Sequence, residues 1–130
     1  MSHHREPVTA LNAPAAIGPY SHAVRAGGLL FCSGQLPLDP ESGEIAGDTP
    51  AEQTRRCLEN LGAVCAAAGT TLSDAVRMTV YVTDMDAFAE VNEAYGVFFE
   101  GDAPARVAIG VAALPKNAQV EIDAIVALPG

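Results

Sequence analysis

Apolar and polar residues alternate over residues 75–83, AVRMTVYVT, and this alternation predicts a strand. Two more runs of the same kind follow Pro104, namely 105–112 and 119–127, with the turn LPKNA between them. Near the start, 23–34 (AVRAGGLLFCSG) is typical of two short strands joined at Gly27-Gly28, because glycine pairs favour tight hairpin turns.

Two segments have the spacing of helices. Thr49-Pro50-Ala51-Glu52 is a capping box with proline at the first helical position, and the apolar residues after it recur at helical spacing until Gly69. Asp84 is positioned to cap a second helix, which carries Phe88, Val91, Tyr95 and Phe98 on one stripe and ends near Gly101. The order ββαβαββ predicts an α+β layer with both helices on one face of a sheet.

Strict alternation along the strands predicts which side chains meet the helices. The set expected to face the helices is Val76, Met78, Val80, Val82, Val107, Ile109, Val111, Val120, Ile122, Ala124 and Val126. The opposite set is Arg77, Thr79, Tyr81, Arg106, Ala108, Gly110, Glu121, Asp123 and Ile125. Such a mixed second face fits either a solvated surface or an oligomer interface that leaves charged pockets, and periodicity does not decide between them.

Composition narrows the class of protein. The 130 residues fit one domain, 1–130, with enough chain for a substantial core. No apolar run approaches the roughly 18 residues of a spanning helix and no basic-then-apolar leader begins the chain, so we expect a cytoplasmic protein. Seven Lys and Arg against 16 Asp and Glu give a net charge of −9, which argues against binding to nucleic-acid phosphates.

The cysteines support neither a disulfide framework nor a metal site. Cys32, Cys57 and Cys65 are odd in number and lack CxxC or Cys/His spacing. Buried, reduced thiols are the simplest interpretation, and no metal is expected.

An arginine inside the small, apolar run GDAPARVAIG is the first candidate for chemistry. Arg106 and Glu121 are predicted on one sheet face, where they could form an ordinary surface ion pair. Alternatively, the guanidinium could bind a substrate carboxylate while Glu121 positions or deprotonates a water molecule. Tyr20 closes the loop NAPAAIGPY and Ser33 lies in SGQ, where turn and capping roles are the simplest. Ser33 lacks a GxSxG context, which argues against nucleophilic hydrolysis.

Several sequence blocks together resemble one known family. They are NAPAAIGPYS, FCSGQLPLDPESGEI, QTRRCLENLGAVCAAAG, VYVTDMDAFAEVNEAY, APAR and LPKNAQVEIDAIVA. In this order and spacing, from about Asn12 to Ala127, they are similar to the RidA/YjgF/YER057c/UK114 family, some of whose members carry endoribonuclease L-PSP names. The resemblance implies a chorismate-mutase-like subunit with a mixed sheet, assembled as a homotrimer around a central barrel, with sites in clefts between neighbouring subunits.

The resemblance also implies an activity, the hydrolysis of reactive 2-imino acids and their 2-enamino tautomers to 2-keto acids and ammonia without a cofactor. By position, Arg106 in APAR matches the family's carboxylate anchor and Glu121 in VEIDA its water-positioning acid. Tyr20 and Ser33 match residues that shape the pocket and bind the ligand, and Gly34 matches a glycine where backbone approaches the ligand. A charge-assisted bidentate contact is worth roughly 1.5 to 3 kcal/mol, enough to orient a small acid.

The chain departs from the family pattern around the arginine. Most close members have an aromatic residue before PAR, a serine-cysteine pair after it and an acidic residue shortly beyond. Here these positions hold Ala103, Val107-Ala108 and Gly110, which implies a roomier and less polar pocket.

Three other functions remain open. The same clefts could bind 2-keto acids or other small carboxylates without turnover. The chain could instead deaminate a specialised catabolic enamine. A ribonuclease is the weakest reading, because the chain is acidic.

Overall fold

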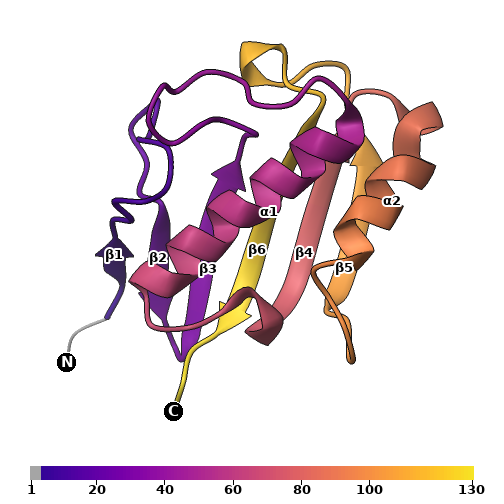
Figure 1. Cartoon of the computed structure of the whole chain (residues 1–130). Coiled ribbons are helices and arrows are strands. Elements are labelled where there is room, and N and C mark those ends of the chain that lie inside the picture. The colour runs from indigo at the N-terminus through magenta and orange to yellow at the C-terminus, as the bar shows by residue number, and fades with distance from the viewer. Residues whose placement is uncertain (1–3) are drawn as a thin grey trace.

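The computed structural model describes residues 4–130, which form one mixed six-stranded sheet and two α-helices (Figure 1). The strands are β1 (Glu6–Val8), β2 (Ala23–Ala26), β3 (Leu29–Gln35), β4 (Ala75–Val82), β5 (Ala105–Gly110) and β6 (Val120–Ala127). The helices are α1 (Pro50–Ala67) and α2 (Phe88–Gly96), and single 3₁₀ turns lie at Leu72–Asp74, Met85–Ala87 and Pro115–Asn117.

The strand order is β1-β2-β3-β6-β4-β5, and only the β4–β5 pair is parallel. Both helices cover the same face, with α1 packed on β3 and β6 and α2 packed beside α1 (Figure 1). The predicted α+β class with two helices on one face is therefore confirmed. The pattern missed β1, whose three residues are too few to alternate visibly and which is held to β2 partly by an Arg25–Glu6 ion pair of 3.1 Å.

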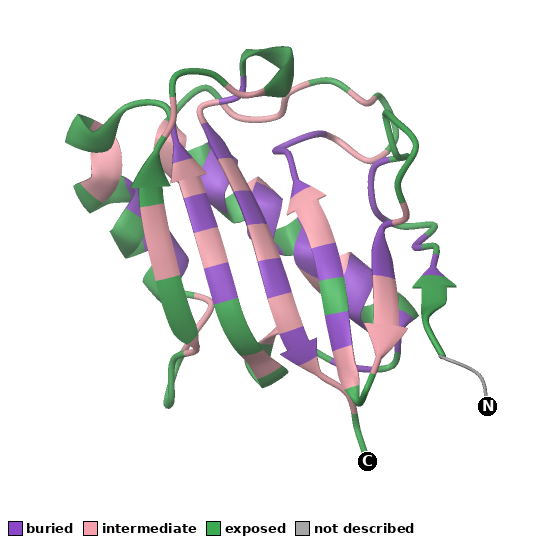
Figure 2. Cartoon of the chain, turned by 180° about the vertical axis from the view of Figure 1, so that it is seen from behind, coloured by how far each residue is buried: buried purple, intermediate pink, exposed green. Residues whose placement is uncertain are grey.

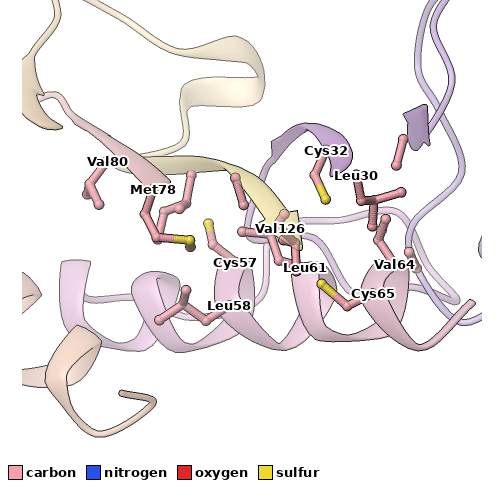
Figure 3. Packing of buried hydrophobic residues seen from close by; sticks show 14 of the residues in the cluster. Leu30, Cys32, Cys57, Leu58, Leu61, Val64, Cys65, Met78, Val80 and Val126 are labelled. Carbon is pink, nitrogen blue, oxygen red and sulfur yellow. The ribbon is translucent and has the colours of Figure 1, made fainter. Parts of the chain in front are cut away.

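The first helix forms as predicted. Thr49 accepts a hydrogen bond from the Glu52 N–H, Glu52 reaches back to the cap, and Pro50 occupies the first turn. Its apolar face points at the sheet, where Leu58, Leu61 and Val64 are completely buried (Figure 3). All three cysteines lie free and buried in this core, which confirms the expectation of buried, reduced thiols.

The second helix is shorter than predicted. The Asp84 side chain accepts a hydrogen bond from the Asp86 N–H at 2.9 Å, but it caps the 3₁₀ turn rather than α2. The helix also ends at Gly96 rather than near Gly101. Just beyond it, the Phe98 and Phe99 N–H groups donate to the Tyr95 and Gly96 carbonyls in i→i+3 bonds, so the chain leaves through tighter turns.

The predicted side-chain faces are correct for β6 and for most of β4. Buried residues alternate with half-buried ones along both strands (Figure 2). Val76 is an exception, with 47% exposure instead of helix contact. A register shift against β6 between Ala75 and Arg77 breaks the alternation there.

The predicted faces of β5 are wrong. In the parallel register Arg106 lies beside Met78 and Ala108 beside Val80, and residues paired in this way point to the same face. Because Met78 and Val80 are buried under the helices, Arg106 and Ala108 share the helix side. Val107 and Ile109 therefore occupy the open face, and Ile109 is 41% exposed. As the edge strand, β5 is partly exposed on both faces, so apolar parity there is a weak guide.

Residues 4–130 contain neither a candidate membrane span nor a candidate metal site. No helix in this range is long and apolar enough to cross a membrane. No group of three or more His, Cys, Asp or Glu side chains in this range is placed to hold a metal ion.

A buried amide on α1 holds the segment that follows β3. Asn60, 1% exposed, donates from Nδ2 to the Leu36 carbonyl at 3.1 Å and to the Leu38 carbonyl at 3.0 Å. Without this donor the Leu38 carbonyl would lose its side-chain partner in a water-poor environment, and the Leu36 carbonyl would keep only the Leu38 N–H at 2.8 Å. The helix layer thus fixes the backbone path beyond the end of β3.

We expect Asn60→Ala to lower the free energy of unfolding by about 1 to 3 kcal/mol, because the buried Leu38 carbonyl loses its donor and the Leu36 carbonyl loses one of its two donors. Urea unfolding followed by circular dichroism measures this change. Glu59→Ala, on the exposed side of the same helix, is the control and should shift stability by no more than about 0.5 kcal/mol. Equal unfolding midpoints for the two variants would contradict the role of Asn60.

Candidate functional site

A cleft of about 370 Å³ opens on the side of the sheet away from the helices. Its walls come from the 14–20 loop, from residues 33–38 after the middle of β3, and from Pro115 and Glu121. The predicted site residues Tyr20, Ser33, Gly34 and Glu121 therefore meet in one place. Arg106 does not line this cleft.

Glu121 lies against the backbone of β3 at Gly34. A Cβ atom built at position 34 would fall 3.1 Å from Glu121 Cδ and would overlap its Oε2. Gly34 lies inside the register irregularity between Cys32 and Gln35, where β3 shifts against β6. The absence of a side chain is thus what lets the Glu121 carboxyl group occupy the floor of the cleft.

The environment of Glu121 makes its carboxyl group harder to ionise than that of an ordinary glutamate. Burial raises the pKa of this carboxyl group, and the negative charge of Asp123 raises it further. Asp123 in turn accepts a hydrogen bond of 2.8 Å from the Tyr81 hydroxyl, and this bond is the main reason that the pKa of Tyr81 is also raised. A carboxyl group whose pKa lies closer to neutrality can both accept and return a proton during a reaction.

Ser33 and Tyr20 each make a hydrogen bond with the backbone. Ser33 Oγ donates to the Ser21 carbonyl at 2.6 Å, and the Tyr20 hydroxyl accepts from the Ile17 N–H at 3.2 Å. The Tyr20 bond is a turn contact, as expected from the local pattern. The turn or capping role expected for Ser33 is wrong, because Ser33 lies inside β3 and bonds a residue 12 positions earlier in the chain. Each hydroxyl oxygen still has lone-pair capacity, and Tyr20 is 43% exposed, so both residues can also contact a ligand.

Arg106 is held on the other side of the sheet, against α2. Its Nη1 donates to Asn92 Oδ1 at 2.6 Å, and its guanidinium carbon lies 5.0 Å from the Tyr95 ring centre and 5.4 Å from that of Phe88. Such contacts restrict the direction of the guanidinium while Asn92 occupies only one of its five N–H groups.

The sequence patterns missed Asn92 entirely and identified Phe88 and Tyr95 only as core residues of the second helix. The burial of Tyr95 also raises the pKa of its hydroxyl, an effect that the Arg106 charge partly offsets. Only the strand register and helix placement reveal that these three side chains surround Arg106.

The expectation that Arg106 and Glu121 share one sheet face is wrong for a single chain. β4 lies between their strands, and the two side chains leave the sheet on opposite sides. They can form neither an ion pair nor a common pocket within one subunit. Any site that uses both residues must take them from different copies of the chain.

Known proteins of similar sequence cover nearly the whole chain. The profile of the family described as endoribonuclease L-PSP matches residues 10–128. The RutC family protein y4sK of Sinorhizobium fredii is 50% identical over 123 residues, which are 95% of this chain and 98% of that protein. A protein of Salmonella typhimurium named 2-iminobutanoate/2-iminopropanoate deaminase is 49% identical over 117 residues, 88% of this chain and 91% of its own.

Solved structures agree with the fold. A putative endoribonuclease from Thermotoga maritima superposes with a TM-score of 0.91 at 48% identity and covers 96% of this chain and 98% of its own. The E. coli protein TdcF, solved with bound serine, gives a TM-score of 0.89 at 40% identity over 95% of this chain and 99% of its own.

We expect Glu121 to titrate well above Glu52, whose pKa is lowered by hydrogen bonds from the Asp48 and Thr49 N–H groups. Carboxyl ¹³C NMR across the acidic range measures both groups in one sample. Asp123→Asn should lower the Glu121 midpoint without bringing it to the ordinary range, because burial remains. A Glu121 midpoint at or below that of Glu52 would refute the assignment.

The same shift has a stability consequence with a definite sign. The folded chain holds the Glu121 proton more tightly than the unfolded chain does. Wild-type stability should therefore fall as the pH rises from the ordinary glutamate range through the raised pKa, and Glu121→Gln should lack this part of the fall. Parallel pH profiles of unfolding for the two proteins would contradict the shift.

Proposed function

The chain belongs to the RidA/YjgF/YER057c/UK114 family, described also as endoribonuclease L-PSP, and from this premise we propose that it hydrolyses 2-imino acids and their 2-enamino tautomers to 2-keto acids and ammonia. The observation that carries the proposal is the cleft in which Glu121, with its raised pKa, lies beside Gly34, Ser33 and Tyr20. The deaminase name of the Salmonella relative and the serine bound to TdcF support a small substrate of amino-acid type.

Arg106 of a neighbouring copy completes the site in this proposal. Within one chain the guanidinium lies across the sheet from the cleft, at the exposed edge strand β5. The open sheet face carries the apolar side chains of Phe31 and Ile109 at 43% and 41% exposure, which suits burial against other copies. We place three copies around a central barrel, so that each cleft receives one arginine from its neighbour.

In the proposed reaction Arg106 binds the substrate carboxylate through two parallel hydrogen bonds and thereby places C2 of the imine near Glu121. Ionised Glu121 takes a proton from a water molecule as the water oxygen bonds to C2 of the protonated imine, giving a carbinolamine. Glu121 then passes this proton to the amine nitrogen. As the C–N bond breaks and ammonia leaves, Glu121 takes the hydroxyl proton and the C=O bond of the 2-keto acid forms. No strong nucleophile is needed, because a protonated imine is already electrophilic.

We expect Arg106→Ala to lower kcat/KM for 2-iminobutanoate about 10- to 100-fold, which is the loss of one charge-assisted contact. A threonine dehydratase generates the imine in situ, and semicarbazide competes for it. Arg55→Ala, an exposed arginine on α1, is the matched control and should keep wild-type rates. A wild type that binds 2-ketobutyrate without accelerating hydrolysis would instead support a binding module.

Subunit mixing tests whether Arg106 and Glu121 of one site come from different copies. Arg106→Ala and Glu121→Gln should each keep only a small part of wild-type activity. Unfolding and refolding them together in equal amounts should restore about a quarter of wild-type activity, because about a quarter of the interfaces pair an intact arginine with an intact glutamate. If each site were built within one chain, the mixture would stay at the level of the separate variants. Refolded wild type provides the reference for recovery.

A further inference from the structure

His22 is a buried side chain that joins the 14–20 loop to the start of β2. It is 7% exposed and directly precedes Ala23, the first residue of that strand. Its Nδ1 accepts a hydrogen bond of 2.9 Å from the Ala10 N–H, and its Nε2 lies 2.7 Å from the Pro14 carbonyl oxygen. Both ring nitrogens are therefore engaged with the backbone of the segment that leads into the loop.

These two bonds define the state of the ring. A nitrogen that accepts from a backbone N–H carries no proton, so Nδ1 is the bare nitrogen. A carbonyl oxygen can only accept, so Nε2 is the protonated one. His22 is thus neutral, with one tautomer selected by one backbone donor and one backbone acceptor.

Two of the bonds of His22, those to Pro14 and Ser33, end at the walls of the cleft. Pro14 itself lines the cleft and begins the loop that carries Ile17 and Tyr20. On the strand side, the His22 carbonyl accepts from the Ser33 N–H at 3.0 Å, and the neighbouring Ser21 carbonyl accepts from Ser33 Oγ. One residue therefore connects the loop wall to the wall formed by β3.

We propose that His22 is a positioning residue that sets the distance between the Tyr20 wall and the Ser33–Glu121 wall of the cleft. The inference rests on the function proposed above and adds a residue that touches no substrate. The expected effect of His22 on KM and kcat depends on which wall of the cleft its side chain holds. The loop wall contributes contacts to the bound substrate, whereas Glu121 and Gly34 are held by the sheet and stay in place.

Loss of the His22 bonds should therefore raise KM more than it lowers kcat. His22→Leu keeps the approximate volume but leaves the Ala10 N–H and the Pro14 carbonyl unpaired, and we expect KM to rise about 5- to 30-fold. The kcat value should stay within about threefold of wild type. His22→Gln can still donate to the Pro14 carbonyl through its amide, so it should recover most of the lost affinity.

Thr70→Val is the control for loss of a buried bond elsewhere. Thr70 is 6% exposed and donates through Oγ1 to the Ala127 carbonyl at 2.8 Å, at the end of β6 remote from Glu121. This variant should lose stability and keep KM. If His22→Leu and Thr70→Val lose equal stability but only the former changes KM, the effect belongs to the cleft wall. Wild-type KM in His22→Leu overturns the proposal, and so does a Gln variant as impaired as the Leu variant.

A second readout separates this proposal from the function on which it rests. Amide hydrogen exchange by NMR should show the Ala10 N–H protected in the wild type and exposed in His22→Leu, and long-range ¹⁵N–¹H spectra should show the Nε2–H tautomer. If the wild type turns over no imine, the proposed function fails, and the affinity for 2-ketobutyrate takes the place of KM. Unchanged Ala10 exchange and unchanged 2-ketobutyrate affinity in His22→Leu would then reject the positioning role by itself.

Discussion

The contact between the Glu121 carboxyl group and the bare backbone of Gly34 determines the form of the cleft. Any side chain at position 34 would displace the carboxyl group from the floor. Its position there, half-buried and near Asp123, is the cause of its raised pKa. The surrounding walls are arranged about this point, with the segment after β3 held by Asn60 on one side and the 14–20 loop held by His22 on the other.

The parallel pairing of β4 with β5 keeps Arg106 away from this cleft. The sequence predicts Arg106 and Glu121 on one sheet face, and the register places them on opposite faces. Arg106 aligns with Met78 and so projects to the helix side, where Asn92, Phe88 and Tyr95 fix its direction. A single chain therefore holds the Glu121 carboxyl group in the cleft and the Arg106 guanidinium, oriented by α2, on the other side of the sheet. In the assembly that we propose, a neighbouring copy brings its Arg106 to the cleft, so the complete site forms only when copies associate.

The sequence predicted elements whose signals are local and missed those set by tertiary contacts. The capping box at Thr49 and the alternation in β6 depend on neighbouring residues, so α1 and β6 were predicted correctly. The face of β5 depends on which strand it joins and in which direction, and alternation alone does not contain this information. The strand pattern made Arg106 and Glu121 candidates, and the family resemblance supported them and added Tyr20, Ser33 and Gly34. The parts played by Asn92 and His22 required contacts between residues 14 and 12 positions apart in the chain.

The three buried cysteines allow the opening of the core to be followed by chemical labelling. All lie in the core between α1 and the sheet (Figure 3), and burial, with a smaller effect from the charge of Glu121, raises the pKa of the Cys57 thiol well above its usual range. A thiol reagent can reach such groups only when the helix layer separates from the sheet. The labelling rate under native conditions therefore measures how often the core opens, without any introduced probe.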